Sequence, residues 1–174
     1  MTGAEEPSLP SRREIYQAVR DAPGTHFSAL ADRLEYASGT LQYHLAWLVE
    51  EGLLERADDG EYTRYYPTGE FDDADRAAMA ALRRKYSRRI IAHLAADGPA
   101  TTSELAERLE KAPSTVSWHL SRLEEAGIVD RERDGRAVEY ALVDRDRIVR
   151  LYVAYRGSFT DRLVDGLLGI WDGY

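Results

Sequence analysis

The sequence predicts a mainly α-helical fold with small β-hairpin wings, in which one small domain occurs twice in tandem before a C-terminal helical extension. An internal repeat is the first observation: residues 25–68 overlay residues 100–143 at a constant shift of 75, and 17 of the 44 pairs are identical. The second is an apolar stripe at helical spacing in each copy, ended by a glycine and followed by a hairpin signal. A period of 75 residues is too long for a solenoid unit, so we expect two complete copies of one domain.

Length and composition narrow the class of protein. The 174 residues are 44% hydrophobic, which is enough for one ordinary core or two small ones. No run approaches the roughly 20 apolar residues of a membrane span, and the N-terminus lacks a signal-peptide core, so we expect a cytoplasmic protein without membrane contacts. The absence of cysteine excludes disulfides, thiolate catalysis and thiol metal sensing.

The net charge of −8 argues at first against a nucleic-acid partner, because such domains usually carry a basic surface. Only two of the 23 basic residues are lysines, however, and a balance of arginine, Asp and Glu would suit a very salty cytoplasm, as in a halophilic archaeon. At molar salt the screening length falls to about 3 Å, so that local contacts outweigh net charge. A GC-rich genome would explain the shortage of lysine equally well.

The chain divides at changes in pattern. We expect a disordered lead, a first winged-helix domain, a connector helix, a second winged-helix domain and a C-terminal amphipathic segment, at residues 1–10, 11–69, 70–82, 83–143 and 144–174. Because no Pro or Gly occurs between Asp72 and Gly98, one helix of about 25 residues is expected to join the connector to the second domain.

Within the first copy, the expected elements follow from caps and turns. A helix is expected to begin near Ser11, and Ser28 is expected to cap a second one. A turn at Ser38-Gly39 leads into the third helix, and strands at 53–57 and 61–67 flank a hairpin turn.

The third helix of each copy has one face for a core and one for a partner. In the stretch STVSWHLSRLEEAGIV, residues 114–129, Val116, Leu120 and Leu123 share one face, and the other face is polar. A short helix, a glycine stop and a hairpin at Asp134-Gly135 indicate a helix-turn-helix with a wing, which usually binds nucleic acid.

The segments HLSRLEEAGIV and HLAWLVEEGLL resemble the recognition-helix signature of ArsR-type (ArsR/MarR-like) winged-helix regulators. The resemblance covers two blocks of roughly 70 residues and implies a sequence-specific, double-stranded DNA-binding transcription regulator whose recognition helix enters the major groove. Carried over, it points to Ser114, Thr115, Ser117, Trp118, His119 and Arg122, and in the first copy to Thr40, Gln42, Tyr43 and His44. The chain departs from the family in two ways: it has SELAERL where metal-sensing members have a cysteine pair, and it fuses two copies.

The two copies are not equally suited to DNA. The second offers Arg122 on its exposed face and Arg131, Arg133 and Arg136 around its wing, all able to hold a phosphate or read a guanine. The first copy has Trp47 in place of Arg122, an acidic wing tip and few cations. Among these cations, Arg64 is a candidate DNA contact. An exposed Trp47 beside Tyr43 suggests a helix covered by another surface, so we expect the second copy to be the main reader. The alternative is that both copies bind in a pseudo-twofold arrangement.

The densest basic run comprises Arg83, Arg84, Lys85, Arg88 and Arg89. Its place at the start of the second domain favours phosphate contact for Arg84, Lys85, Arg88 and Arg89, and the alternative is pairing with nearby carboxylates, which contributes little when exposed.

No catalytic or metal motif stands out. His44 and His119 occupy equivalent positions, where a half-buried, hydrogen-bonded histidine is the simpler interpretation. No phosphate loop, nucleophile elbow or paired-histidine motif occurs, so we expect no enzyme activity, no metal and no cofactor, and a small-molecule effector is undefined.

The C-terminal segment has no counterpart in the first half. Its apolar stripe needs a partner surface, and we expect this to be the same helix of a second chain, giving a homodimer through Ile148, Leu151, Tyr152, Tyr155, Phe159, Leu163, Leu167 and Ile170. The alternative is that the stripe packs back on the connector helix.

A protein-binding function is the alternative to DNA binding. Tandem winged helices also occur in protein-protein adaptors such as the chromosome segregation and condensation proteins. Trp47, Trp118 and the acidic surface would suit that role, whereas Arg122 and Arg136 favour DNA.

Overall fold

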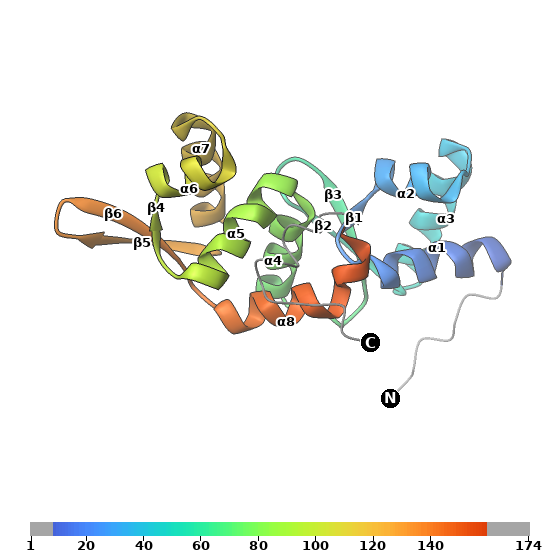
Figure 1. The fold of residues 1–174 in the computed structure, drawn as a ribbon. Coiled ribbons are helices and arrows are strands. Elements are labelled where there is room, and N and C mark those ends of the chain that lie inside the picture. Colours follow the sequence, from blue (N-terminus) through green and yellow to red (C-terminus); the bar gives the residue numbers. More distant parts are fainter. Residues whose placement is uncertain (1–8, 160–174) are drawn as a thin grey trace, which may run out of the picture. The chain divides into compact units, whose positions relative to one another are not determined.

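A computed structural model describes residues 9–159, and the chain forms two compact units, Met1–Arg76 and Ala77–Tyr174. Each unit holds one three-stranded antiparallel sheet, and helices make up most of the remaining structure (Figure 1). The predicted mainly α fold with small β-hairpin wings is therefore confirmed.

The first unit is built from three helices and a small sheet. The helices are α1 (Pro10–Asp21), α2 (Phe27–Leu34) and α3 (Ser38–Glu50), and the strands are β1 (Thr25–His26), β2 (Leu54–Asp58) and β3 (Thr63–Pro67). The central strand β3 pairs antiparallel with both neighbours in the order β1-β3-β2. One face of each helix closes the core, which contains Ile15, Val19, Leu30, Leu41, Leu45, Leu48, Leu54 and Tyr65.

Two local expectations for the first unit are wrong. Helix α2 begins at Phe27, because the Nδ1 atom of His26 accepts a hydrogen bond from the N–H of Ala29 at 3.3 Å and so caps the helix in place of Ser28. Ser38 and Gly39 form the first turn of α3, not a turn before it.

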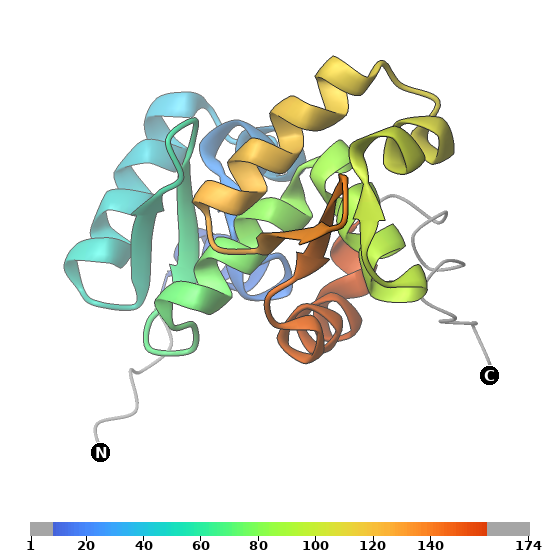
Figure 2. The same ribbon diagram turned by 90° about the vertical axis from the view of Figure 1, so that its left-hand side faces the viewer.

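The second unit repeats this order and adds a C-terminal helix. Its elements are α5 (Lys85–Asp97), β4 (Ala100–Thr101), α6 (Thr102–Leu109), α7 (Pro113–Glu125), β5 (Val129–Asp134), β6 (Ala137–Leu142), α8 (Arg145–Tyr155) and a 3₁₀ turn η1 (Arg156–Ser158). Thr101 and Glu104 form a reciprocal capping box at the start of α6. Helix α5 contacts α6, α7 and β6, so it is the central support of this unit (Figure 2).

The single long helix expected between Asp72 and Gly98 is wrong. It is divided into α4 (Asp73–Arg83) and α5 by Arg84, whose backbone is extended. In a continuous helix the carbonyl of Leu82 would accept the N–H of residue 86. Here the buried Arg88 guanidinium donates to that carbonyl at 2.7 Å, so a side chain replaces the backbone bond and the helix ends without Gly or Pro.

Helix α8 packs within the second unit. Asp144 caps it by accepting a hydrogen bond from the N–H of Arg147 at 3.0 Å, and Arg145 donates to the carbonyl of Ala95 on α5 at 2.7 Å. Beyond α8, the Phe159 ring stacks on Tyr152 at 5.2 Å between centroids. The start of α8 is therefore attached to α5, and Phe159 packs back on α8 itself.

This packing corrects part of the predicted dimer face. Ile148, Leu151 and Tyr152 are at most 6% exposed in a single chain, because residues of their own chain already cover them. Their burial within one chain favours the alternative of packing back over a dimer face, and the connector helix contributes to this packing through Arg83, which donates to Ser158. Tyr155 and Phe159 are half-buried, while Leu163, Leu167 and Ile170 lie outside the described residues.

Candidate nucleic-acid interface

Helix α7 of the second unit presents the clearest candidate surface. Its buried face consists of Val116, Leu120 and Leu123, as the helical spacing predicts. On the other side, Ser114, Thr115, Ser117 and Trp118 are exposed and Arg122 is half-buried. Trp118 is 55% exposed and carries the Arg122 guanidinium over its ring at 4.8 Å. A cation is thus held on an exposed aromatic plane at the surface of the helix.

His119 lies between this surface and α5. Its ring is 4.9 Å from that of Trp118 and 5.7 Å from that of Tyr86, between centroids. Burial lowers the pKa of His119, and the charges of Arg122 and Arg84 lower it further. His119 is half-buried as expected. Its buried Nδ1 atom has no hydrogen-bond partner within residues 9–159, so the hydrogen bond that was expected of it is not observed there. No group of three or more potential metal ligands occurs in the same range.

The second wing is formed by β5 and β6. Gly135 has a φ of +61° at its tip, a left-handed conformation that glycine adopts without strain. Arg131 pairs with Glu124 of α7 at 3.1 Å. Arg133 and Arg136 are exposed, and neither has a carboxylate partner within residues 9–159. Two cations of this wing are therefore available to an anionic partner.

The basic run at the start of α5 is divided between surface and interior. Lys85 is exposed, while Arg84 and Arg89 are half-buried. Arg88 is 5% exposed, and its guanidinium donates a hydrogen bond to the carbonyl of Leu82 at the break between α4 and α5. Its predicted phosphate contact is therefore wrong. Arg83 also points inward and donates to the carbonyl and hydroxyl oxygens of Ser158 at 3.1 and 2.9 Å.

The equivalent helix of the first unit, α3, presents fewer polar groups. Thr40, Gln42 and Tyr43 are exposed, Tyr43 by 64%. His44 is half-buried and within hydrogen-bond distance of Ser11 Oγ, at 3.3 Å. It therefore has the structural environment that was expected of it.

Trp47 was expected to be exposed, and this is wrong. Its ring is half-buried against the core of its own domain, and the guanidinium of Arg12 lies 3.8 Å from its centroid. Because Arg12 of α1 covers the ring, Trp47 does not need a second surface to bury it.

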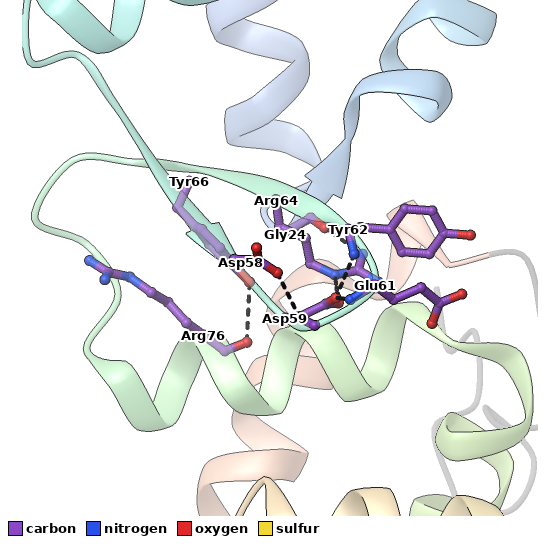
Figure 3. Close-up of polar contacts among 9 residues, drawn as sticks. Gly24, Asp58, Asp59, Glu61, Tyr62, Arg64, Tyr66 and Arg76 are labelled. Atoms are coloured by element: carbon purple, nitrogen blue, oxygen red, sulfur yellow. Dashed lines mark hydrogen bonds and ion pairs between the residues drawn. The ribbon is translucent and has the colours of Figure 1, made fainter.

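The first wing is closed by its own side chains (Figure 3). Arg64 is 2% exposed, forms an ion pair with Asp59 and donates to the carbonyl of Gly24 at 2.8 Å. Its predicted DNA contact is therefore wrong. Burial opposes the ionisation of Asp59, but hydrogen bonds from the N–H groups of Tyr62 and Glu61 and from Arg64 outweigh it and lower the pKa of Asp59.

The charge of the chain is divided unevenly between the two copies. Residues 9–76 contain seven arginines against fourteen Asp and Glu residues, whereas residues 77–143 contain eleven Arg and Lys against ten Asp and Glu. The acidic balance that argued against nucleic acid thus belongs mainly to the first copy, and the second copy is close to neutral.

Two residues of this surface were not among the sequence candidates. Tyr86 contacts His119, and Lys111 lies over the ring of Tyr86 at 4.9 Å. Extending the shift of 75 back to the first helix of each copy would have aligned Tyr86 with Ser11 and shown the difference.

Comparisons with known proteins agree with this geometry. Residues 10–79 match a family described as an N-terminal HTH domain, and residues 84–132 match a family described as a helix-turn-helix domain. Each match overlaps one of the two copies that the repeat defines, at residues 25–68 and 100–143. The chain therefore contains two winged helix-turn-helix domains in tandem and is a DNA-binding transcription regulator, which points away from an enzyme.

Solved structures of HlyU from Vibrio cholerae are also similar. The reduced form is 23% identical, with a TM-score of 0.42, over 50% of this chain and 90% of that one. A second HlyU structure is 25% identical, with a TM-score of 0.42, over 50% of this chain and 95% of that one. A search of curated proteins found no match. Within residues 9–159, no helix is both long and apolar enough to cross a membrane.

Proposed function

We propose that the protein is a sequence-specific, double-stranded DNA-binding transcription regulator, as its resemblance to ArsR-type regulators implies, and that its second domain is the main reader. Helix α7 enters the major groove, and the wing of β5 and β6 follows the backbone. Contacts to phosphates position such a domain, and contacts to base edges give its specificity.

The observation that carries this proposal is the arrangement of cations on the second domain. Arg122 lies over the exposed Trp118, and Arg133 and Arg136 extend from the wing without carboxylate partners among the described residues. At the equivalent place in the first domain, Trp47 is covered by Arg12 and the wing cation Arg64 is buried. One copy therefore offers positive groups to a partner, and the other binds its cations internally.

The polar and aromatic residues of α7 have separate roles in this arrangement. The planar guanidinium of Arg122 suits bidentate recognition of guanine, and the Trp118 ring limits its orientation. The hydroxyl groups of Ser114, Thr115 and Ser117 are at the N-terminal half of the helix and can bind phosphates or base edges. His119 supports the helix from behind, with no direct contact to DNA.

The first domain supports a second candidate function, that of binding a protein. Its excess of carboxylates disfavours phosphate contact, and the exposed Tyr43 is a residue type common in protein interfaces. The alternative is that Thr40, Gln42 and Tyr43 contact DNA as a weaker second reader.

The test of DNA binding uses a mixed-sequence duplex of about 30 base pairs and fluorescence anisotropy of the full chain over a range of salt. Replacing Arg133 and Arg136 with Gln removes two cations, so the slope of log affinity against log salt should become shallower by about 1.8. The control replaces Arg20 and Arg33 of the first domain with Gln, which should leave the slope unchanged. Failure of the wild type to bind at low salt would reject the DNA reader in favour of the protein-binding function.

We further propose that the regulator acts as a homodimer, because paired helix-turn-helix domains read two half-sites of an operator. Support comes from the apolar sequence positions Leu163, Leu167 and Ile170, whose spacing suits one helix face. Static light scattering should give about twice the mass of the 19.7 kDa chain. A monomer mass at micromolar concentration would exclude this assembly.

A further inference from the structure

The two lysines of the chain meet at one aromatic ring. Lys85 is the first residue of α5, and Lys111 lies in the turn between α6 and α7. Their ammonium groups are 5.9 and 4.9 Å from the centroid of Tyr86. All other Lys and Arg positions of the chain are arginines, so this ring is distinguished by having both lysines beside it, each from a different element.

The backbone fixes Lys111 in position. Glu110 adopts a left-handed conformation with a φ of +53°, and the N–H of Lys111 bonds to the carbonyl of Ala106 at 3.0 Å, a Schellman-type closure of α6. The Tyr86 ring in turn contacts His119 of α7. The three side chains are thus placed directly beside the helix proposed to read DNA.

The electrostatic environment of the cluster is positive. Lys85 and Lys111 are exposed, and within residues 9–159 neither forms an ion pair with a carboxylate. A hydrogen bond from Lys111 lowers the pKa of the Tyr86 hydroxyl, the charge of Lys111 adds to this, and Lys85 and Arg89 contribute further. An anion placed here would meet two ammonium groups and a phenol, and neither ammonium group is held in an ion pair by a carboxylate of the described chain.

The first domain provides an internal comparison. At the shift of 75, Pro10, Ser11 and Tyr36 occupy the positions of Lys85, Tyr86 and Lys111. There the Tyr36 hydroxyl donates to the carboxylate of Glu14, and Ser11 bonds to His44. The first copy therefore fills this place with its own hydrogen bonds and has no cation at any of the three positions.

We propose that Lys85, Tyr86 and Lys111 form a phosphate-binding site of the second domain, which holds the DNA backbone beside α7; this rests on the proposed function. Ammonium groups bind phosphate as point charges, and the phenol donates a hydrogen bond to a phosphate oxygen. The contact carries no base information and sets the register in which Trp118 and Arg122 meet the base edges.

The experiment measures affinity of the full chain for the mixed-sequence duplex of about 30 base pairs as salt is varied. In the variant Lys85→Gln/Lys111→Gln, loss of two phosphate contacts should make the log–log slope shallower by about 1.8. Tyr86→Phe should weaken binding while leaving the slope near that of the wild type, because it removes a neutral donor. The Arg20→Gln/Arg33→Gln control loses the same charge from the first domain and should keep the wild-type slope.

The outcomes separate this site from the function on which it rests. An unchanged slope in the lysine variant, with a shallower one in the Arg133→Gln/Arg136→Gln variant, would overturn the phosphate site and leave DNA binding in place. An equal change in the first-domain control would also overturn it, since net charge would then explain the effect. If the wild type binds no duplex, both proposals fall. Circular dichroism of each variant confirms that a changed slope does not reflect unfolding.

Discussion

Replacing Arg64 with Ala is expected to destabilise the first domain by about 3–5 kcal/mol, because it leaves the largely buried carboxylate of Asp59 without its counter-charge. The Arg64 side chain is 2% exposed and that of Asp59 is 11% exposed. The same change removes the donor to the Gly24 carbonyl, which joins the wing to the segment before β1. No surface ion pair of this chain is expected to contribute as much.

Native-state hydrogen exchange is the suitable measurement, because it reports the opening free energy of each unit separately. Protection of the β2 and β3 amides should fall in the Arg64→Ala variant, while that of β5 and β6 should not. The matched control is Glu139→Ala, since residue 139 is the counterpart of residue 64 at the shift of 75 and is expected to change stability by about 0.5 kcal/mol or less. Unchanged protection in β3 would show that this ion pair does not hold the wing closed.

The ion pair between Arg64 and Asp59 predicts that the stability of the first unit depends on pH. The pKa of Asp59 is lowered in the folded state from its ordinary value of 3.8, so the carboxylate contributes stability above that value. This contribution is lost as the pH falls through the folded pKa. In an Asp59→Asn variant, the first unit should therefore be less stable at neutral pH and lose less of its stability in acid than the wild type.

The repeat and its cores could be predicted because they depend on local periodicity. Leu41, Leu45 and Leu48 in α3 occupy the same face as their counterparts in α7, and all are buried. The hairpin turns could also be predicted from the sequence, because Gly60 and Gly135 adopt left-handed conformations at the two wing tips. Such signals are contained within one element or one turn.

The corrected residues depend on neighbours that are distant in the sequence. Trp47 lies on the polar side of its helix by periodicity, but Arg12 of α1 covers it. Arg88 lies in a basic run that resembles a solvated face, yet its guanidinium replaces a backbone bond at Leu82. Helical spacing cannot show either contact, because each is made between separate elements.

A comparison between the copies contains more information than either copy alone. Asp59 and Arg64 correspond to Asp134 and Glu139, so a pair of opposite charges in the first wing becomes a pair of like charges in the second. Because two carboxylates cannot form an ion pair with each other, this difference indicates a wing closed by its own side chains in the first copy and an open one in the second. The difference between the two wings therefore supports the predicted inequality of the copies more directly than the difference between Arg122 and Trp47 does.

Replacing Arg122 with Ala is expected to reduce affinity for the preferred DNA site by about 10- to 100-fold, because one bidentate contact to a guanine contributes about 1–3 kcal/mol of discrimination. The preferred site can be obtained by selection from a randomised duplex with the wild-type chain. Binding to a mixed-sequence duplex should change much less, since phosphate contacts dominate there. Base readout by Arg122 predicts a loss of specificity rather than a uniform loss of affinity.

Matched aromatic variants separate the two domains in the same assay. Trp118→Ala removes the ring that lies under Arg122 and should reproduce part of the loss in specificity. Tyr43→Ala removes the exposed aromatic at the equivalent position of the first domain and should leave specificity unchanged if the second domain is the main reader. An equal loss in both variants would instead favour the pseudo-twofold arrangement, in which α3 and α7 each read DNA. If Arg122→Ala weakens selected and mixed-sequence duplexes by the same factor, Arg122 is a phosphate contact and the base readout must be assigned to other residues of α7.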